Sequence, residues 1–370
     1  MSADALADEP GLRVARRERA FDQLDAHGID VLLLGREANA RYVSGARRLW
    51  TAGTRPFGPG CVVVRSTREI HLVSTWEEGV PDDIPHEHLF GITWNPGNLL
   101  AWLGGIDGVA DAKRVGTDAL TPRFARLLPK VFPDAELVDA QPALDAARRI
   151  KTTGEIAAIK EAIAVAEAAL AASVAEVRPG VTERRLAAVF MDTMAAHGVT
   201  TPATQRVARF STRPERRGAS APAHPGDLVT FDAGVVAGGY VAEVARTWPV
   251  GPDAADRAGP RFGRADDLWD RLLGACRPGA TGHDLLAAYD DAGEALPPIP
   301  IATGLGLGFD VPVITRDLPS TAAGERLDPG MVLAVTAQVG DGPGAVVRKD
   351  VVLITADDPE VLTSSPHWVP

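Results

Sequence analysis

Cysteine is scarce in this 370-residue chain, which contains only Cys61 and Cys276. Two cysteines so far apart exclude a disulfide framework and a cysteine-rich metal knuckle. No run of Lys and Arg offsets the net charge of −11, so a general attraction to nucleic acid or to anionic membranes is excluded. The apolar runs fall short of the roughly 20 residues of a membrane span, and residues 1–20 lack the apolar stretch of a signal peptide. We therefore expect a soluble, cytoplasmic protein with no nucleic-acid or membrane partner.

The first part of the chain alternates helical and strand-like patterns. Apolar residues between 12 and 26 recur three and four positions apart, which predicts a helix that ends at Gly28. The apolar run at 29–35 is typical of a buried parallel strand. Two further strands are expected at 61–65 and 70–74. Three further helices are expected at 99–103, 121–128 and 142–148. This alternation predicts an α/β domain over residues 1–147.

A different pattern begins at residue 148 and indicates a second domain, 148–370. Thr152 and Glu155 have capping-box spacing at the start of an alanine-rich helix that runs to about residue 175. The sequence Arg-Pro-Gly-x-Thr occurs at Arg178–Thr182 and again at Arg277–Thr281. The repeat indicates either an internal duplication or two simple helix-start signals. Further elements are expected as strands at 228–232, 240–247, 331–336 and 346–355 and as a helix at 265–276.

Two acidic residues stand in a distinctive pair of motifs. Gly226–Gly234 reads GDLVTFDAG and Gly239–Thr247 reads GYVAEVART, so that Asp232 and Glu243 are eleven positions apart. This pair resembles the central signature of the M24 peptidases, a family that includes methionine aminopeptidase, prolidase, aminopeptidase P and creatinase. Other segments resemble family motifs in the family order, at Gly28–Gly45, Arg149–Ile156, Arg178–Glu183, Gly304–Pro312, Pro329–Val332 and Lys349–Thr355.

The resemblance covers nearly the whole chain and implies its fold. We expect an α/β creatinase-like N-terminal domain followed by an α+β pita-bread domain whose sheet has pseudo-two-fold symmetry. The resemblance also implies a homodimer.

The same resemblance implies a site for two divalent metal ions, held by two Asp, one His and two Glu, which activate a bridging water. The corresponding positions here are Asp232, Glu243, Thr303, Thr336 and Lys349. An ammonium roughly 4 Å from a divalent ion is repelled by about 8 kcal/mol at an effective dielectric of about 20. We therefore expect no metal ligand set and no other cofactor.

Lys349 is predicted to stand where the metal ions would be. Its ammonium would pair with Asp232 and Glu243, two acids that would otherwise raise each other's pKa. In a strand, Lys349 shares a face with Val347 and Val351, and this is the inner face if the strand keeps its family role. The alternative is a one-residue slip that places Lys349 on the surface.

Five further residues are candidates for substrate binding. Thr303 and Thr336 are either hydrogen-bonding groups or space-fillers. Asp310 lies in the turn that carries a catalytic His in the family. Arg213 and Arg216 belong to an Arg-rich segment, 206–217, that fits recognition of a carboxylate or phosphate, with a solvated loop as the alternative.

Three other residues are interpreted as structural. Arg246 follows the family's second Asp position, where Arg is usually a structural partner. Asp350 points to the face opposite Lys349, and Cys276 lies in a helical apolar pattern, so both are expected to stabilise the fold.

Three functions remain open. The first is a metal-independent hydrolase that acts on a C–N bond of a small molecule, with Asp232, Glu243 and Lys349 as its acid–base residues. Creatinase is the family precedent for metal-free hydrolysis, although it uses His and Glu residues that this chain lacks. The second is a non-catalytic binding protein, a pseudoenzyme. The third is a metal-dependent Xaa-Pro aminopeptidase or dipeptidase, the function that the family resemblance alone implies. The identity of the small molecule stays open.

Overall fold

The computed structural model describes residues 10–368, apart from 48–57, 92, 94, 205, 211–219, 318–324 and 341–343. The chain divides between Arg148 and Arg149 into two compact units. None of the described helices is both long enough and apolar enough to cross a membrane.

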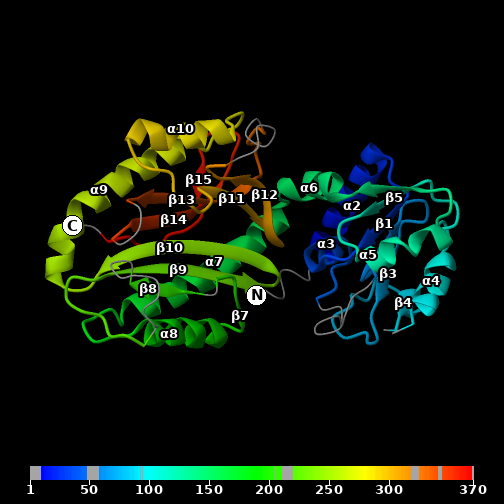
Figure 1. Ribbon diagram of the computed structural model, residues 1–370, viewed down its shortest axis with the longest axis horizontal. Coiled ribbons are helices and arrows are strands. Elements are labelled where there is room, and N and C mark those ends of the chain that lie inside the picture. Colours follow the sequence, from blue (N-terminus) through cyan, green and yellow to red (C-terminus); the bar gives the residue numbers. More distant parts are fainter. Residues whose placement is uncertain are drawn as a thin grey trace. The chain divides into compact units, whose positions relative to one another are not determined.

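The first unit is built around a six-stranded mixed sheet with strand order β4-β3-β2-β1-β5-β6 (Figure 1). Its core lies between the central strands and the helices that follow β4 and β5, and includes Val31, Val62, Leu103 and Phe124. The elements of this unit are α2 (Pro10–His27), β1 (Val31–Leu34), α3 (Glu37–Ser44), β2 (Cys61–Val64), β3 (Glu69–Val73), the 3-10 helix η1 (His86–His88), β4 (Leu89–Phe90), α4 (Pro96–Gly104), β5 (Arg114–Thr117), α5 (Pro122–Ala125), the 3-10 helix η2 (Leu128–Lys130), β6 (Glu136–Asp139) and α6 (Gln141–Arg149).

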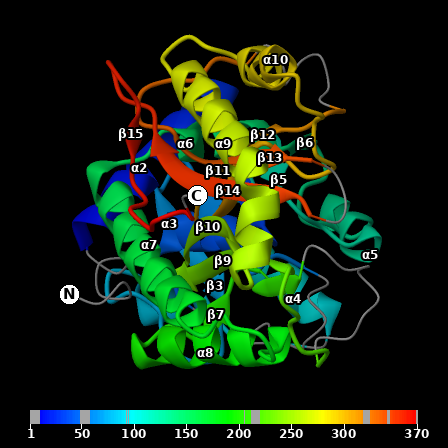
Figure 2. The ribbon, with the colours of Figure 1, turned by 90° about the vertical axis from the view of Figure 1, so that its left-hand side faces the viewer.

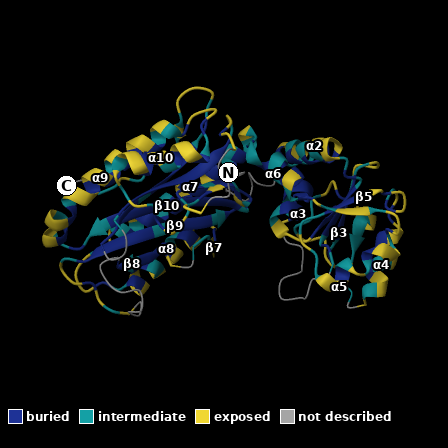
Figure 3. Ribbon diagram, turned by 45° about the horizontal axis from the view of Figure 1, so that its top comes forward, coloured by how far each residue is buried: buried dark blue, intermediate teal, exposed yellow. Residues whose placement is uncertain are grey.

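The second unit is built around a nine-stranded sheet whose main path is β12-β11-β13-β14-β10-β9-β7, with β15 beside β14 and β8 beside β9. Figure 3 shows that its long strands are buried while its helices expose their outer sides. Its elements are α7 (Thr153–Val174), α8 (Glu183–Ala196), β7 (Thr201–Pro202), β8 (Ala208–Phe210), β9 (Leu228–Ala237), β10 (Tyr240–Pro249), α9 (Pro252–Ala275), α10 (Gly282–Ala292), β11 (Ala302–Gly306), β12 (Gly308–Ile314), β13 (Val332–Val339), β14 (Val346–Leu353) and β15 (Glu360–Val361).

Two long helices cover one face of this second sheet (Figure 2). Helix α7 packs against β9 and β10, and α9 packs against β13 and β14. The Tyr240 hydroxyl on β10 donates to Glu155 of α7 at 3.4 Å, and Arg348 of β14 donates to Asp266 of α9 at 3.2 Å. Since side chains alternate along a strand, the odd-numbered residues of β10 and β14 point to the other face.

The two Arg-Pro-Gly-x-Thr turns, Arg178–Thr182 and Arg277–Thr281, form equivalent hydrogen bonds. The Gly N–H of the first turn donates to the Ala223 carbonyl at 2.8 Å, and the Ala223 N–H donates back to the next residue of the turn at 2.6 Å. In the second turn, Leu327 takes the place of Ala223, at 2.8 and 2.7 Å. Each turn precedes a helix and is linked to the segment ahead of a long strand, which supports the duplication interpretation over two unrelated start signals.

The open ends of the hairpins β9–β10 and β13–β14 are joined by equivalent backbone hydrogen bonds. The Gly226 N–H donates to the Val250 carbonyl at 3.0 Å, and the Gly330 N–H donates to the Ile354 carbonyl at 2.8 Å. The two glycines are 104 positions apart in the sequence, and so are the two carbonyl residues. The second unit therefore has the predicted pseudo-two-fold sheet, and the predicted α/β plus α+β pita-bread fold is confirmed.

One helix begins earlier than its sequence predicts. Helix α9 begins at Pro252 rather than at residue 265, and contains Pro260. Ala254, Ala258 and Phe262 continue the apolar face of the helix at spacings of four, and all three are buried. Burial of this face against the sheet outweighs the roughly 3 kcal/mol cost of an interior proline.

Candidate functional site

Four adjacent strands bring one residue each into a single row. Asp232 on β9 pairs with Ala245 on β10, Ala245 pairs with Lys349 on β14, and Lys349 pairs with Thr336 on β13. Directly paired residues project from the same face of a sheet, so all four lie on the face opposite α7 and α9. Because Ala245 has only a methyl side chain, the long Lys349 side chain can extend across it toward Asp232.

The predicted ion pair of Lys349 is present. Its ammonium Nζ donates to Asp232 Oδ1 at 3.0 Å and to Glu243 Oε2 at 3.2 Å. Glu243 lies two residues before Ala245 on β10 and therefore shares its face. The side chains of Lys349 and Glu243 are 10% and 9% exposed, whereas that of Asp232 is 42% exposed. The pair is thus buried on the Glu243 side and open to solvent on the Asp232 side.

The two buried members of this cluster have shifted pKa values. Burial lowers the pKa of the Lys349 ammonium, but the Asp232 and Glu243 carboxylates outweigh it, so the net pKa is raised. Burial raises the pKa of Glu243, and the nearby Asp232 adds to this, while Lys349 opposes it. Lys349 therefore stays protonated and positively charged at neutral pH. Glu243 binds a proton more readily than an ordinary Glu.

The structure describes three of the other five predicted site residues. Thr336 is buried in the row, and Thr303 on β11 pairs with Ala334, two residues from Thr336 and on the same face. Asp310 lies in a buried ion pair, accepting from Lys151 Nζ at 2.9 Å, and both side chains are at most 5% exposed. Arg213 and Arg216 lie outside the described residues, so the predicted carboxylate-binding role of their segment stays a prediction.

The opposite face of β10 and β14 holds a second ion pair. Arg246 Nη2 donates to Asp350 Oδ1 at 2.5 Å, and the side chains are 2% and 1% exposed. Thr363 also donates to Asp350, and Ser365 accepts from Arg246 through its carbonyl. The structural roles predicted for Arg246 and Asp350 are confirmed, since the pair links two strands to the C-terminal segment.

Comparison with known proteins gives the family. The sequence model of metallopeptidase family M24 matches residues 157–356, and that of the creatinase/prolidase N-terminal domain matches residues 16–150. The chain belongs to metallopeptidase family M24. It is 25% identical over 367 residues to the uncharacterized peptidase YqhT of Bacillus subtilis, covering 96% of this chain and 98% of that protein.

Solved structures of M24 proteins share the fold. The prolidase of Pyrococcus horikoshii OT3 and an Xaa-Pro dipeptidase of Bacillus anthracis each superpose with a TM-score of 0.78 at 21% identity. Each comparison covers 96% of this chain and 99% of the other. The family assignment supports a hydrolase of the peptidase type.

The side chains at the five positions that the M24 resemblance assigns to metal ligands do not fit a pair of divalent ions. A two-metal site relies on hard carboxylate oxygens and an imidazole. Here two carboxylates face an ammonium that hydrogen-bonds to both, and the two remaining positions are neutral threonines. An ammonium in this position competes with a divalent ion for the same two carboxylates.

Sequence reasoning missed two features of the site. The partner of Asp310 is Lys151, 159 positions away, and no local pattern links the two residues. Ala245 lies between Lys349 and Asp232 and leaves room for the lysine side chain. This role depends on how β9, β10 and β14 pair, which the sequence alone does not show. The one signal available for Ala245 was its position between two conspicuous polar residues, Glu243 and Thr247, on alternate positions of a strand.

Proposed function

We propose that this M24 protein is a metal-independent hydrolase that acts on a C–N bond of a small polar molecule at the Lys349 cluster. The observation that carries the proposal is the hydrogen bonding of Lys349 Nζ to both Asp232 and Glu243. A fixed ammonium supplies positive charge at the point where M24 enzymes use metal ions. The 42% exposure of Asp232 supports access by a solute.

The three charged residues have different capacities for catalysis. Lys349 keeps its proton, because its pKa is raised, and so it acts as a cation and hydrogen-bond donor. Glu243, whose pKa is also raised, is the better general base, since a base works best when its pKa approaches the working pH. Asp232 reaches solvent and holds the ammonium in place.

The proposed reaction is a water addition. Glu243 accepts a proton from water, and the remaining hydroxide forms a bond to the electrophilic carbon of the substrate. The Lys349 ammonium stabilises the oxygen or nitrogen on which negative charge develops. The C–N bond then breaks, and Glu243 returns its proton to the departing nitrogen.

The test is hydrolysis of a panel of small amides, ureas, guanidino compounds and Xaa-Pro dipeptides, followed by mass spectrometry in the presence of a chelator. We expect turnover that persists with the chelator and falls by at least about 100-fold in Lys349→Met, because one oxyanion donor contributes about 10²–10³-fold. Lys160→Met, which removes an exposed lysine that pairs with Glu360, is the matched control. Turnover that is unchanged in Lys349→Met would contradict the proposal.

A second candidate is an Xaa-Pro peptidase that depends on metal ions. Family membership favours it, as does the fold shared with a prolidase and an Xaa-Pro dipeptidase. It predicts Xaa-Pro cleavage that requires Mn²⁺, Co²⁺ or Zn²⁺ and is lost in the Asp232→Asn, Glu243→Gln double variant. Cleavage of this kind would replace the first proposal. Small-molecule binding without turnover would favour the non-catalytic binding protein.

A further inference from the structure

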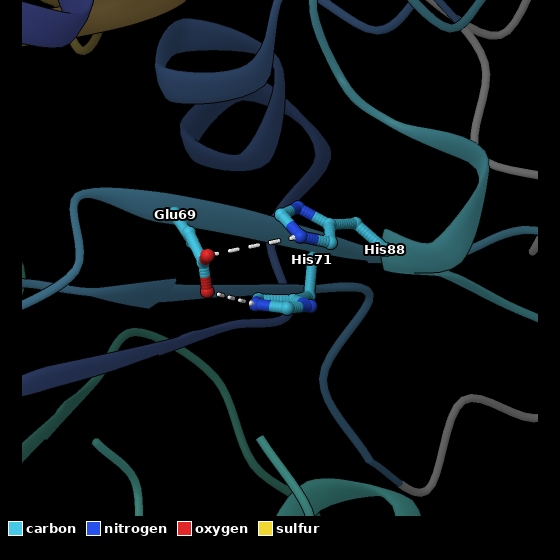
Figure 4. Close-up of side chains that lie close together, drawn as sticks. All are labelled: Glu69, His71 and His88. Atoms are coloured by element: carbon cyan, nitrogen blue, oxygen red, sulfur yellow. Dashed lines mark hydrogen bonds and ion pairs between the residues drawn. The ribbon is translucent and has the colours of Figure 1, made fainter. Parts of the chain in front are cut away.

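The first unit contains a cluster of one carboxylate and two imidazoles, Glu69, His71 and His88 (Figure 4). Glu69 and His71 are alternate residues of β3 and therefore project from one face. Leu72 of β3 pairs with Leu89 of β4 in parallel, which places His88, just ahead of β4, next to His71. Among the described residues, this is the group of His, Cys, Asp and Glu with the geometry of a metal site.

We propose that Glu69, His71 and His88 bind one divalent ion of the zinc class. His71 Nε2 lies 3.3 Å from Glu69 Oε2, and His88 Nε2 lies 3.9 Å from Glu69 Oε1. The three ligand atoms lie within 4.8 Å of one another. Ligands about 2.0–2.1 Å from a tetrahedral zinc ion are roughly 3.4 Å apart, so small side-chain rotations bring all three atoms into range.

The hydrogen bonding of His88 orients its ligand nitrogen. His88 Nδ1 lies 3.2 Å from the Ile70 carbonyl oxygen. A carbonyl only accepts, so Nδ1 carries a hydrogen, and Nε2 is left as the ring nitrogen whose lone pair can bind a cation. That lone pair faces the Glu69 carboxylate. A backbone carbonyl on the far nitrogen is the usual way that a metal-binding His is fixed, and a cation between Nε2 and the carboxylate removes the conflict between two acceptors.

Aromatic packing holds the two imidazoles in place. The rings of His71 and His88 stack with centroids 4.1 Å apart at 30°. Trp102 of α4 lies edge-on to His71 at 6.5 Å and stacks on Phe90 at 4.8 Å. The side chains of His71 and His88 are 8% and 17% exposed, while that of Glu69 is 37% exposed. The ligand set is thus preorganised, with an opening to solvent at the carboxylate.

A proton is the competing cation. Protonation of one imidazole would give an ordinary His–Glu ion pair, but the second imidazole, stacked on the first, could not be charged as well without repulsion. A divalent ion engages both imidazoles and the carboxylate at once. Two His and one Glu with a fourth position for water is the ligand set of several zinc sites. Bound here, the ion would fasten the two-residue strand β4 to β3.

The test is a Zn²⁺ titration of the full-length protein after chelator treatment, at neutral pH, by calorimetry and by competition with a chromophoric chelator. We expect one Zn²⁺ per chain, a visible Co²⁺ spectrum typical of tetrahedral coordination, and a rise in melting temperature on Zn²⁺ addition. Glu69→Gln and His88→Ala should each weaken binding by at least about tenfold, since even the loss of a supporting hydrogen bond costs roughly 10–100-fold.

Two controls separate this site from others in the chain. His86→Ala removes a neighbouring histidine that is 81% exposed and pairs with Glu77 instead, and it should bind Zn²⁺ like the unchanged protein. Asp232→Asn with Glu243→Gln should also leave this binding unchanged. The inference is wrong if no Zn²⁺ binds in the low-micromolar range, if Glu69→Gln and His88→Ala bind it normally while their circular dichroism shows a native fold, or if binding is lost in the Asp232, Glu243 double variant instead.

Discussion

At the scale of single residues, the row Asp232–Ala245–Lys349–Thr336 combines charge and shape. The ammonium reaches Asp232 only because position 245 carries a methyl group, and it reaches Glu243 because that residue shares the face. The M24 resemblance and strand alternation together predicted the Lys349 ion pair, because the resemblance assigned the three residues to one site and alternation gave the face of Lys349. The Lys151–Asp310 pair, which joins a helix start to a strand, has no such periodicity and could not be predicted.

The first prediction concerns the charge of Lys349. Lys349→Met keeps the apolar stem but leaves Asp232 and Glu243 without a cation, which raises the pKa of Glu243 further. We expect a loss of roughly 1.5–3 kcal/mol in the free energy of unfolding at neutral pH, the range for hydrogen bonds to charged groups. Denaturant unfolding followed by circular dichroism measures the loss.

The pH dependence of the Lys349→Met variant has a definite sign. A carboxyl whose folded pKa lies above its unfolded pKa binds more protons when folded, so its stability contribution falls as pH rises through that window. The variant should therefore recover stability relative to the unchanged protein below neutral pH, as Glu243 protonates. Lys160→Met, from a pair whose side chains are both 48% exposed, should change stability by only about 0–1 kcal/mol at any pH. If the loss of unfolding free energy in Lys349→Met does not shrink on acidification, the unpaired carboxylates are not its cause.

At the scale of elements, the repeated turns show what short motifs can and cannot predict. Two five-residue matches left duplication and coincidence both open, whereas the shared hydrogen bonds of the two turns support duplication. The short strands β5 and β6 were not predicted, because their sequences RVGT and ELVD include polar residues, whereas the equally short β1 and β2 are continuous apolar runs. Helix α9 was predicted too short, because a proline in its interior hid a continuous buried face.

The second prediction concerns the glycines of these turns. Gly180 and Gly279 have φ of +87° and +81°, and a Cβ at either position meets no atom closer than 3.7 Å. Only the backbone opposes a side chain there, so Gly180→Ala and Gly279→Ala should each cost about 1–2 kcal/mol of unfolding free energy. Thermal and denaturant unfolding give the two values, which should agree within error.

An exposed helix glycine provides the opposite expectation. Gly263 lies inside α9 with open space around its Cα, so Gly263→Ala should stabilise the protein by about 0.5–1 kcal/mol. Equal signs for Gly263 and the two turn glycines would contradict the role of positive φ in the turns. A large difference between the two turns would contradict the equivalence of the two halves.

At the scale of the whole molecule, the stability of the protein at low pH depends on the buried carboxylate of Asp350. Burial raises the pKa of Asp350, but Arg246, Thr363 and Arg348 outweigh it, so the net pKa lies below the ordinary 3.8. A depressed folded pKa contributes stability that is fully present above the unfolded pKa and is lost as pH falls through the folded pKa. The contribution is thus complete at neutral pH and declines below about pH 4.

The third prediction follows from that sign. Asp350→Asn leaves the buried Arg246 without its carboxylate and should cost about 3–5 kcal/mol at neutral pH. The difference from the unchanged protein should shrink below pH 3.8, because Asp350 protonates there in the unfolded chain and at still lower pH in the folded protein. Asp266→Asn, from a pair that is 35% exposed at the acid, should cost about 0–1 kcal/mol. Urea unfolding across pH checks both, and a constant Asp350→Asn deficit down to the lowest pH would contradict the assignment.

Family motifs in the sequence predicted the two-domain fold, because they recur in the family order along nearly the whole chain. The loss of M24 metal ligands stays a prediction. The Glu69 cluster could not be predicted, because it depends on a parallel pairing with a two-residue strand. The homodimer stays a prediction, which light scattering of the purified protein can measure. If the purified protein contains one zinc ion per chain, variants of Glu69 and His88 are needed to decide whether the ion lies at that cluster or at the M24 site.

The position of Lys349 also bears on the order of folding. Both acids belong to one local hairpin, β9–β10, whereas the lysine is 106 and 117 positions away in the chain. Contacts of such long separation form late. Until β14 docks, the hairpin would hold two neighbouring negative charges with no counterion, so acidic conditions or bound cations should ease the early collapse of this half of the sheet.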